Sequence, residues 1–213
     1  TFKNYIFSRQ IILVSLIFLI CFIFTTYLHT TFTKKEAIKH SEGISKQVFS
    51  SMYQVMRKGW SREDVIIFAK SLEDNFVGSN YQINIYREDK VKQLFGEIQE
   101  KEKDATLVDI LNGKIEKLNG FEDNIVRNIL PLKATADCKS CHLNAEVGDV
   151  LGVVEVKQNL NSIFLESKYQ YIVFFLIIVP IFYLLAFFSS RYTTKPIIKN
   201  LTLFNDKVQN INS

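Results

Sequence analysis

The sequence predicts an α+β fold: one domain of helices and antiparallel strands, preceded and followed in the chain by a transmembrane helix. Two charge-free stretches near the chain ends predict the transmembrane helices, and helical periodicity that gives way to β-type alternation predicts the domain. A chain of 213 residues that is 47% hydrophobic, with only 3 Pro and 8 Gly, is not a disordered, collagen-like or disulfide-framework protein.

Charge is distributed unevenly along the chain. Residues 1–10 carry two bases and no acid, residues 11–30 no charge, residues 31–168 twenty bases and twenty-one acids, and residues 169–213 four bases and one acid. The excess of positive charge therefore lies at the two ends. A nucleic-acid-binding protein would carry its basic residues as a patch on the folded domain, so no nucleic-acid partner is predicted.

Residues 11–28 and 172–188 are the predicted transmembrane helices. The first would be about 27 Å long, close to the thickness of the hydrocarbon core of a bilayer. The alternatives are a cleaved signal peptide for the first and a buried core helix for the second. No small-residue cleavage site follows residue 28, and a core helix rarely runs for 17 residues without charge or strong polarity. We therefore expect a multi-pass protein with the lipid bilayer as a partner.

The positive-inside rule predicts the orientation of both helices. Lys3 and Arg9 precede the first, and three bases follow the second: Arg191, Lys195 and Lys199. Residues 1–10 and 189–213 would then be cytoplasmic. Residues 31–168 would lie outside, which in a bacterium is the periplasmic side of the inner membrane.

The outer domain begins with two predicted helices. Residues 34–58 contain no Pro and repeat apolar side chains at helical spacing, so a helix should continue from the first span until Gly59. Ser61 and Asp64 have the spacing of a capping box ahead of an apolar run that extends to Leu72, which predicts a second, shorter helix.

Strands and one more helix follow. Residues 81–86 alternate like a strand, and residues 91–95 could be its hairpin partner. The lysine- and glutamate-rich residues 97–103 are expected as a solvated loop or helix start. A short helix should end near Gly113, and β-branched runs predict two further strands, at residues 125–130 and 150–156. Two helices followed by about four antiparallel strands suggest a domain of PAS or Cache type.

The chemistry lies between the last two strands, at Cys138-Lys139-Ser140-Cys141-His142. Cys-x-x-Cys-His is the attachment signature of c-type haem, in which two thiols bond the vinyl groups and the imidazole binds the iron. From this composition the pattern would arise by chance with a probability of about 6 in 10,000. One covalent haem c, held by Cys138, Cys141 and His142, is therefore predicted.

Three alternatives explain the motif less well. A structural zinc site needs four ligands, and outside the membrane the chain offers only the two motif cysteines with His29, His40 and His142. A thioredoxin-like redox pair would open a helix in a βαβ unit, which is not predicted here. A plain disulfide does not explain His142. Cys21, in the first span, is given no role.

The sixth iron ligand has several candidates. Met52 and Met56 share one face of the first outer helix, with Met56 slightly favoured, although such methionines usually fill a core. His40 and His29 are further candidates, and an open or water-filled position is another. Methionine ligation favours redox sensing, whereas an open position favours binding of NO, CO or oxygen.

Arg87 and Arg127, on predicted strands, could form bidentate hydrogen bonds with the haem propionates. The alternative is that both are ordinary solvated strand residues.

From about Ser51 to Val156 the sequence resembles the periplasmic c-type haem sensor domains that precede bacterial chemoreceptors, histidine kinases and diguanylate cyclases. The segments that carry the resemblance, besides the haem motif, are Met52–Gly59 (similar to Met-Asn-x-x-Met-x-x-Gly, with Tyr53 in place of Asn), Ile83–Arg87, Leu94–Gly96, Arg127–Leu132 and Gly148–Val153. The resemblance implies a PAS-like fold and a homodimer, in some members with exchanged N-terminal helices.

After the second span, apolar residues recur with a heptad spacing typical of a parallel coiled coil: Ile197, Leu201, Phe204, Val208 and Ile211. Residues 189–213 resemble the start of a HAMP linker, and the alternative is a short amphipathic helix on the membrane. We expect the chain to be a fragment, with its output domain beyond Ser213. No acid/base or nucleophile cluster accompanies the haem motif, so no enzyme activity is expected within these residues.

Together these features predict the input portion of a bacterial transmembrane receptor that senses redox state or a small gas through its periplasmic haem. The alternative is a membrane-anchored monohaem cytochrome that passes electrons to a periplasmic redox partner.

Overall fold

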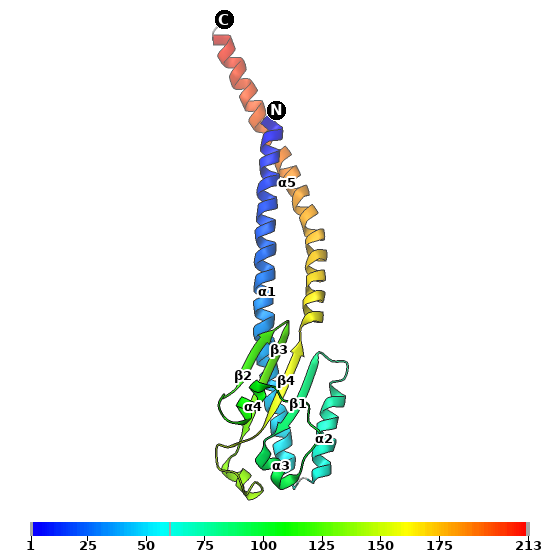
Figure 1. Cartoon of the computed structure of the whole chain (residues 1–213). Helices are drawn as coiled ribbons and strands as arrows, with labels where there is room; N and C mark the ends of the chain where they lie inside the picture. The colour runs from blue at the N-terminus through cyan, green and yellow to red at the C-terminus, as the bar shows by residue number, and fades with distance from the viewer. Residues whose placement is uncertain (1, 60, 212–213) are drawn as a thin grey trace. The chain divides into compact units, whose positions relative to one another are not determined.

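The computed structural model describes residues 2–59 and 61–211 and divides into two units, Thr31–Phe164 and the two chain ends together (Thr1–Thr30 with Leu165–Ser213). Its architecture is α+β, as predicted (Figure 1). A four-stranded antiparallel sheet is preceded in the chain by the long helix α1 (Phe2–Met56) and followed by the long helix α5 (Asn161–Ile211).

The unit of the two chain ends consists of parts of α1 and α5. Both helices are long and apolar enough to cross a membrane, over Phe7–Met56 and Asn161–Tyr192. Within this unit they pack through edge-to-face aromatic pairs, among them Phe18 with Phe182 at 5.2 Å between ring centroids. Ser15 Oγ lies 2.5 Å from the Tyr183 hydroxyl, which gives both polar groups a partner within an apolar interface.

Helix α5 continues through Pro180 and Pro196 to Ile211. The helical backbone over residues 197–211 agrees with the predicted linker helix. The side chains of the five predicted heptad residues lie outside the described residues, so the coiled coil stays a prediction.

The sheet has the strand order β1-β4-β3-β2, with β1 at Tyr81–Arg87, β2 at Leu118–Glu122, β3 at Ile125–Lys133 and β4 at Val150–Asn159. Strands β1, β3 and β4 fall where the alternation and the β-branched runs predicted them. At Gly152 of β4 an added Cβ would lie 2.6 Å from the Tyr86 carbonyl oxygen, so the close approach of β1 and β4 requires glycine.

Strand β2 was not predicted, because Leu118–Glu122 carries no β-branched residue. It pairs with β3 through a two-residue turn at Asp123 and Asn124, whose φ angles of 49° and 60° belong to the left-handed region that such hairpin turns require. Tertiary pairing, rather than local propensity, makes this segment a strand.

The prediction of a hairpin strand at residues 91–95 is wrong, because Asp89–Phe95 is helix α3. The Glu88 side chain accepts a hydrogen bond from the backbone N–H of Lys90, and Gly96, with φ 77°, ends the helix. The neighbour of β1 in the sheet is β4 instead. Short apolar runs fit both a strand and a buried helix face, and here the capping residues decide.

The predicted helix ends are confirmed elsewhere. Helix α1 ends at Met56, shortly before Gly59. Helix α2 (Arg62–Asn75) opens with reciprocal hydrogen bonds: the Ser61 backbone donates to Asp64 Oδ2 at 2.9 Å, and the Asp64 backbone donates to Ser61 Oγ at 3.2 Å.

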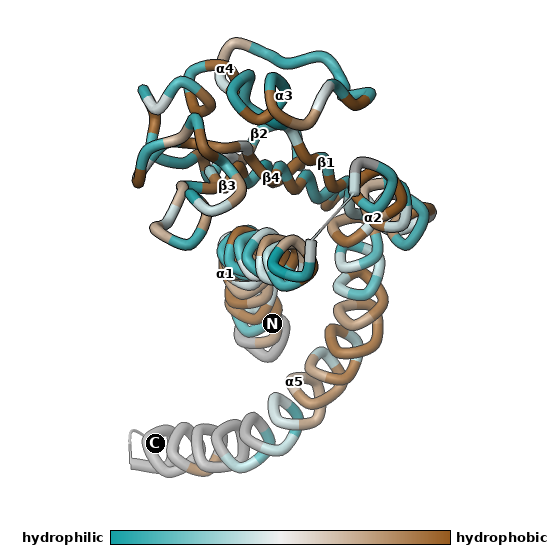
Figure 2. Tube along the Cα trace, turned by 90° about the horizontal axis from the view of Figure 1, so that it is seen from below, coloured by the Kyte–Doolittle hydropathy of each residue, from teal (hydrophilic) through white to brown (hydrophobic). Residues whose placement is uncertain are grey.

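Helices cover both faces of the sheet. Figure 2 shows α1 on one side and α3 with α4 (Ala105–Leu111) on the other, with α2 beside β1. The core under α1 and α2 is formed by Val48, Met52, Ile83, Leu132, Val154 and Val156. The core under α4 is formed by Tyr86, Leu107, Ile110, Leu111, Ile129 and Val153. At one end of the sheet a smaller core of Ala37, Val126 and Leu160 joins α1, β3 and the start of α5.

Candidate functional site

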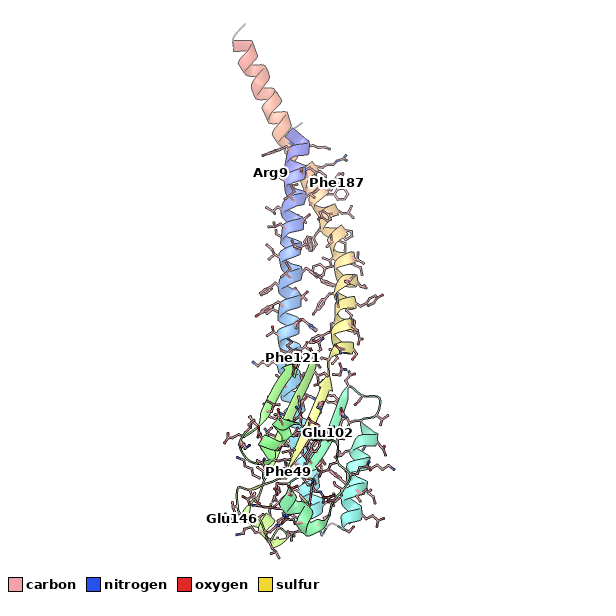
Figure 3. The ribbon with its side chains drawn as sticks, in the orientation of Figure 1. Arg9, Phe49, Glu102, Phe121, Glu146 and Phe187 are labelled. Carbon is pink, nitrogen blue, oxygen red and sulfur yellow. The ribbon has the colours of Figure 1, made fainter. Side chains whose placement is uncertain are left out.

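The haem motif lies in the connection between β3 and β4, as predicted. We call residues 134–149 the motif loop; Figure 3 labels Glu146 within it. A 3₁₀ turn, Ala136–Ser140, carries Cys138, and the backbone N–H groups of Cys141 and His142 both donate to the Cys138 carbonyl, at 3.2 and 2.9 Å. This turn fixes the backbone of the three motif residues. Both thiols are free, Cys141 exposed and Cys138 half-buried.

The His142 imidazole is half-buried and packs edge-on against the Phe95 ring of α3, with 5.1 Å between the ring centroids. Its Nδ1 atom is buried, and among the described residues no hydrogen-bond partner reaches it. Burial lowers the pKa of His142 below its usual 6.5, so the ring is neutral at neutral pH. Neutral imidazole is the form that ligates a metal.

The motif loop is anchored to helix α3. Lys90 Nζ forms an ion pair with Asp149 at 2.7 Å, and Asn144 Nδ2 donates to the Lys90 carbonyl at 2.9 Å. The loop also closes on itself, because the Ala134 backbone donates to the Asp149 carbonyl at 2.7 Å. These contacts hold His142 beside Phe95.

A second anchor joins the motif loop to helix α1. The Tyr53 hydroxyl donates to Asp137 Oδ2 at 3.2 Å, and Asp137 immediately precedes Cys138. Burial, together with this hydrogen bond, raises the pKa of Tyr53. The motif loop is therefore held between α1 and α3.

Large apolar side chains near the motif point into solvent. Leu143 is 80% exposed, and Val147 of the same loop and Leu94 and Phe95 of α3 are exposed as well. Such a group of apolar side chains is typical of a surface that something else covers. Two free thiols, a buried imidazole nitrogen without a protein partner and an adjoining apolar surface fit a covalently attached haem.

The structure does not bring a methionine into contact with the motif by any described interaction. Met52 is 7% exposed and packs in the core with Val48 and Leu132. Met56 packs against the same core but is only partly buried. At 3.6 residues per turn Met56 lies about 40° around α1 from Met52 and about 60° from Tyr53, between the core-facing and the loop-facing side chains. The sixth ligand stays a prediction.

The two histidine candidates for the sixth position have neighbours elsewhere. His40 Nδ1 lies 3.1 Å from the Tyr81 hydroxyl, at the side of β1, and His29 packs against the ring of Tyr171 in the unit of the chain ends.

The two predicted propionate ligands both have carboxylate partners inside the fold, and Arg127 is the more tightly held. Its Nε and Nη2 lie 2.7 and 2.6 Å from Glu155 Oε1, and its Nη1 lies 2.6 Å from Asp104. Arg87 donates from Nη2 to the Gly96 carbonyl at 2.9 Å, and its Nε lies 3.9 Å from Glu100. Neither is an ordinary solvated residue, and their propionate role stays a prediction.

Three residues that shape the site are not among those predicted from the sequence. The sequence predicts Phe95 in a strand and Glu100 in a solvated stretch, and it marks Tyr53 only as a departure from the Asn of the resembling family. For Phe95 the signal was present, since Glu88 and Gly96 bracket a helix. Nothing in the run of residues 97–103 distinguishes the buried Glu100 from its exposed neighbours.

Within residues 2–59 and 61–211 no group of three or more His, Cys, Asp or Glu side chains, the three motif residues included, is placed to hold a metal ion. No protein-family model matches the chain, and no curated protein matches it either.

Proposed function

We propose that the chain is the input portion of a bacterial transmembrane receptor whose periplasmic domain carries one c-type haem on Cys138, Cys141 and His142. The observation that carries the proposal is the Cys-x-x-Cys-His turn, which combines two free thiols with a neutral imidazole whose buried Nδ1 has no hydrogen-bond partner among the described residues. Two helices long and apolar enough to cross a membrane support the membrane location, and the basic residues at the chain ends support the orientation.

Attachment needs no chemistry beyond what the two thiols supply. Each thiol adds across a vinyl double bond, so that one S–C bond forms and the thiol hydrogen passes to the neighbouring carbon. His142, held neutral by burial, offers a nitrogen lone pair. When bound, the haem supplies either a one-electron redox change or an open iron position for a small gas.

Burial favours Met56 over Met52 as a sixth ligand. Withdrawing the enclosed Met52 from the core would leave a cavity, and the loss of a buried methionine side chain typically costs 2–5 kcal/mol. Met56, half-exposed at the end of α1 and between Met52 and Tyr53 around the helix, can leave its position more cheaply.

Two routes connect the motif loop with the helices that could cross the membrane. The first runs through Asp137 and Tyr53 into α1, which is one uninterrupted helix from Phe2 to Met56. The second runs along β4, which ends at Asn159 beside the buried Leu160, directly before α5. A change of ligation at the haem can therefore act on α1 and on α5.

Signalling requires that the two haem states differ in their preference for two packings of the domain. Moving such a two-state equilibrium from 1:99 to 99:1 takes a free-energy difference of about 5.5 kcal/mol. Loss or exchange of an axial ligand is an event of that order. In a homodimer with a HAMP linker, a shift of α5 against its partner copy would be the output.

The test is the visible spectrum and the mass of the full chain produced in a host with cytochrome maturation machinery. We expect the mass of one haem and the band positions of thioether-attached haem, both lost in Cys138→Ala/Cys141→Ala and retained in the matched control Cys21→Ala. Met56→Leu should change the reduced spectrum and Met52→Leu should not. A colourless chain without added mass would falsify the proposal.

A membrane-anchored electron carrier is the second candidate, and the exposure of the motif loop favours it, because electron transfer needs an accessible haem edge. Disulfide crosslinking between the α5 helices of two copies of the chain distinguishes a receptor from an electron carrier. A receptor should change its crosslinking pattern between the oxidised and reduced states, whereas a carrier should keep one pattern.

A further inference from the structure

Residues 97–104, which we call the strap, connect α3 with α4 without regular structure, and Glu102 is labelled there in Figure 3. One side chain of the strap is directed inward: that of Glu100 is only 7% exposed. Its carboxylate lies 3.1 Å from Lys103 Nζ, 3.3 Å from Lys92 Nζ and 3.9 Å from Arg87 Nε. It also accepts a hydrogen bond from the Arg87 backbone at 2.9 Å.

We propose that Arg87, Lys92 and Lys103 form a seat for a propionate of the haem, and that Glu100 fills this seat as a stand-in carboxylate until the haem is attached. The inference rests on the proposed function, and it assigns to Lys92, Lys103 and Glu100 a role toward the haem beyond that of the motif residues.

The cations hold the Glu100 carboxylate at long distances. The shortest N···O distance to it, 3.1 Å from Lys103, exceeds the 2.7–2.9 Å typical of a charge-assisted hydrogen bond. Lys92 also lies 3.8 Å from Asp89, whose side chain is 81% exposed. Charges removed from water need close partners, so a second or better-placed carboxylate would stabilise this cluster.

The seat adjoins the haem motif. Arg87 Nη2 donates to the carbonyl of Gly96, the residue after Phe95, and the Phe95 ring packs on His142. Lys92 belongs to the same helix, α3, whose Lys90 pairs with Asp149 of the motif loop. Helix α3 has seven residues and is about 10 Å long, so His142 and the seat lie at one short element.

Arg127 is a poorer seat for a propionate. Its guanidinium already makes contacts of 2.6–2.7 Å with Glu155 and Asp104, and Glu155 is fully enclosed. A propionate would have to displace a well-placed, buried carboxylate. At Arg87 a propionate would displace the Glu100 carboxylate instead. Its cations lie at 3.1–3.9 Å, and it belongs to a segment without regular structure.

Displacement of Glu100 has a consequence for the strap. Glu100 joins the strap to the cations of α3 and to the Arg87 backbone, whereas Lys103 Nζ donates separately to the Arg87 carbonyl at 3.1 Å. When a propionate takes the seat, residues 97–102 lose their buried anchor. The strap should then open locally more often, which a protease can report.

The experiment is limited trypsin digestion of the full chain in detergent, with the rate of cleavage after Lys101 followed by mass spectrometry. The haem-loaded chain is compared with the haem-free Cys138→Ala/Cys141→Ala chain, and the loaded state is verified independently by spectrum and mass. We expect cleavage after Lys101 to be about tenfold faster in the loaded chain.

Two variants of the haem-free chain test the stand-in role. Glu100→Gln should be cleaved as fast as the loaded chain, because the neutral amide no longer anchors the strap. The matched control Glu102→Gln, an exposed glutamate of the same strap, should be cleaved as slowly as the haem-free parent.

The outcomes separate the two proposals. A chain that gains no haem overturns the proposed function and this inference with it. A chain that carries haem but keeps the strap as protected as in the haem-free form overturns the inference alone, as does slow cleavage of the haem-free Glu100→Gln chain.

Discussion

Glu155 and Glu100 are both enclosed carboxylates, but they are held very differently. Glu155, on the central strand β4, is 0% exposed and accepts hydrogen bonds from Arg127 at 2.7 Å, Asn84 at 2.9 Å and the Tyr86 hydroxyl at 3.3 Å. Glu100, on the strap, has its cations at 3.1–3.9 Å. Burial and, to a smaller extent, proximity to Glu155 raise the pKa of Tyr86, so its hydroxyl stays a donor.

The difference teaches which part of the domain is complete without a ligand. The partners of Glu155 come from β1 and β3, which the sheet fixes on either side of β4, so register alone assembles the network. The partners of Glu100 meet it from a short helix and an irregular segment beside the haem motif. A network set by strand pairing is a structural element, whereas one held by a strap can exchange a partner.

The largest expected effect comes from breaking the Glu155 network. Glu155→Gln removes the charge that pairs with Arg127 in a buried site and should lower the free energy of unfolding by roughly 3 kcal/mol. Glu100→Gln should lower it by about 1 kcal/mol, since its contacts are longer. Pulse proteolysis of the full chain measures both, with the exposed Glu122→Gln as the control. Equal losses at the two glutamates would remove the distinction drawn between them.

A second effect is expected at the contact between α1 and the sheet. The Ser45 hydroxyl, fully buried, donates to Asn128 Oδ1 at 2.6 Å. Ser45→Ala leaves that buried oxygen without this donor and should cost about 1–3 kcal/mol. Ser50→Ala, on the exposed face of the same helix, should be neutral or slightly stabilising because alanine favours helix. Urea titrations followed by proteolysis compare the two, and a neutral Ser45→Ala would show that this contact does not hold α1.

Secondary-structure elements could be predicted from the sequence where local signals and burial agree. The capping residues Ser61 and Asp64 predicted the start of α2, and the β-branched run of β4 predicted a strand. They could not be predicted where tertiary contacts determine the structure. For example, β2 is a strand because it pairs with β3 across the Asp123-Asn124 turn. The motif could be found because its chemistry depends on spacing along the chain.

The surroundings of the motif could not be predicted in the same way. Phe95 contacts His142 only because α3 is a helix that lies beside the motif loop, and Glu100 is buried only because three cations from different segments meet there. Charge composition marks residues 97–103 as solvated, and the one inward side chain has no local signature.

A smaller effect on stability, but a specific effect on function, is expected at Tyr53. Tyr53→Phe removes one solvent-exposed hydrogen bond and should lower the free energy of unfolding by less than Ser45→Ala does. In the haem-loaded chain it should also weaken the redox dependence of α5 crosslinking. A double-mutant cycle with Asp137→Asn isolates the pair, and additive effects of the two substitutions would show that they do not act together.

The smallest expected effect is the pH dependence of the anchor between the motif loop and α3. The Asp149 carboxylate accepts a hydrogen bond from the Glu146 backbone and pairs with Lys90, and these contacts lower its pKa below the usual 3.8. Because the folded state holds this proton less tightly than the unfolded state, the contribution of Asp149 is complete above about pH 3.9 and is lost as the pH falls through the lower, folded-state pKa.

Hydrogen exchange at the backbone amide of Gly148, which donates to the Ala134 carbonyl at 2.9 Å, reports this anchor directly. Protection of this amide should decrease as the pH falls below the usual pKa of an aspartate, about 3.9, whereas amides of β4 opposite β3 should stay protected over the same range, since strand pairing holds them. Asp149→Asn should have lower protection at pH 6 and lose the pH dependence. If its profile matched that of the parent chain, the loop would be held to α3 by Asn144 and by the packing of Phe95 on His142 alone, and the motif side of the domain would be as firmly built as the sheet.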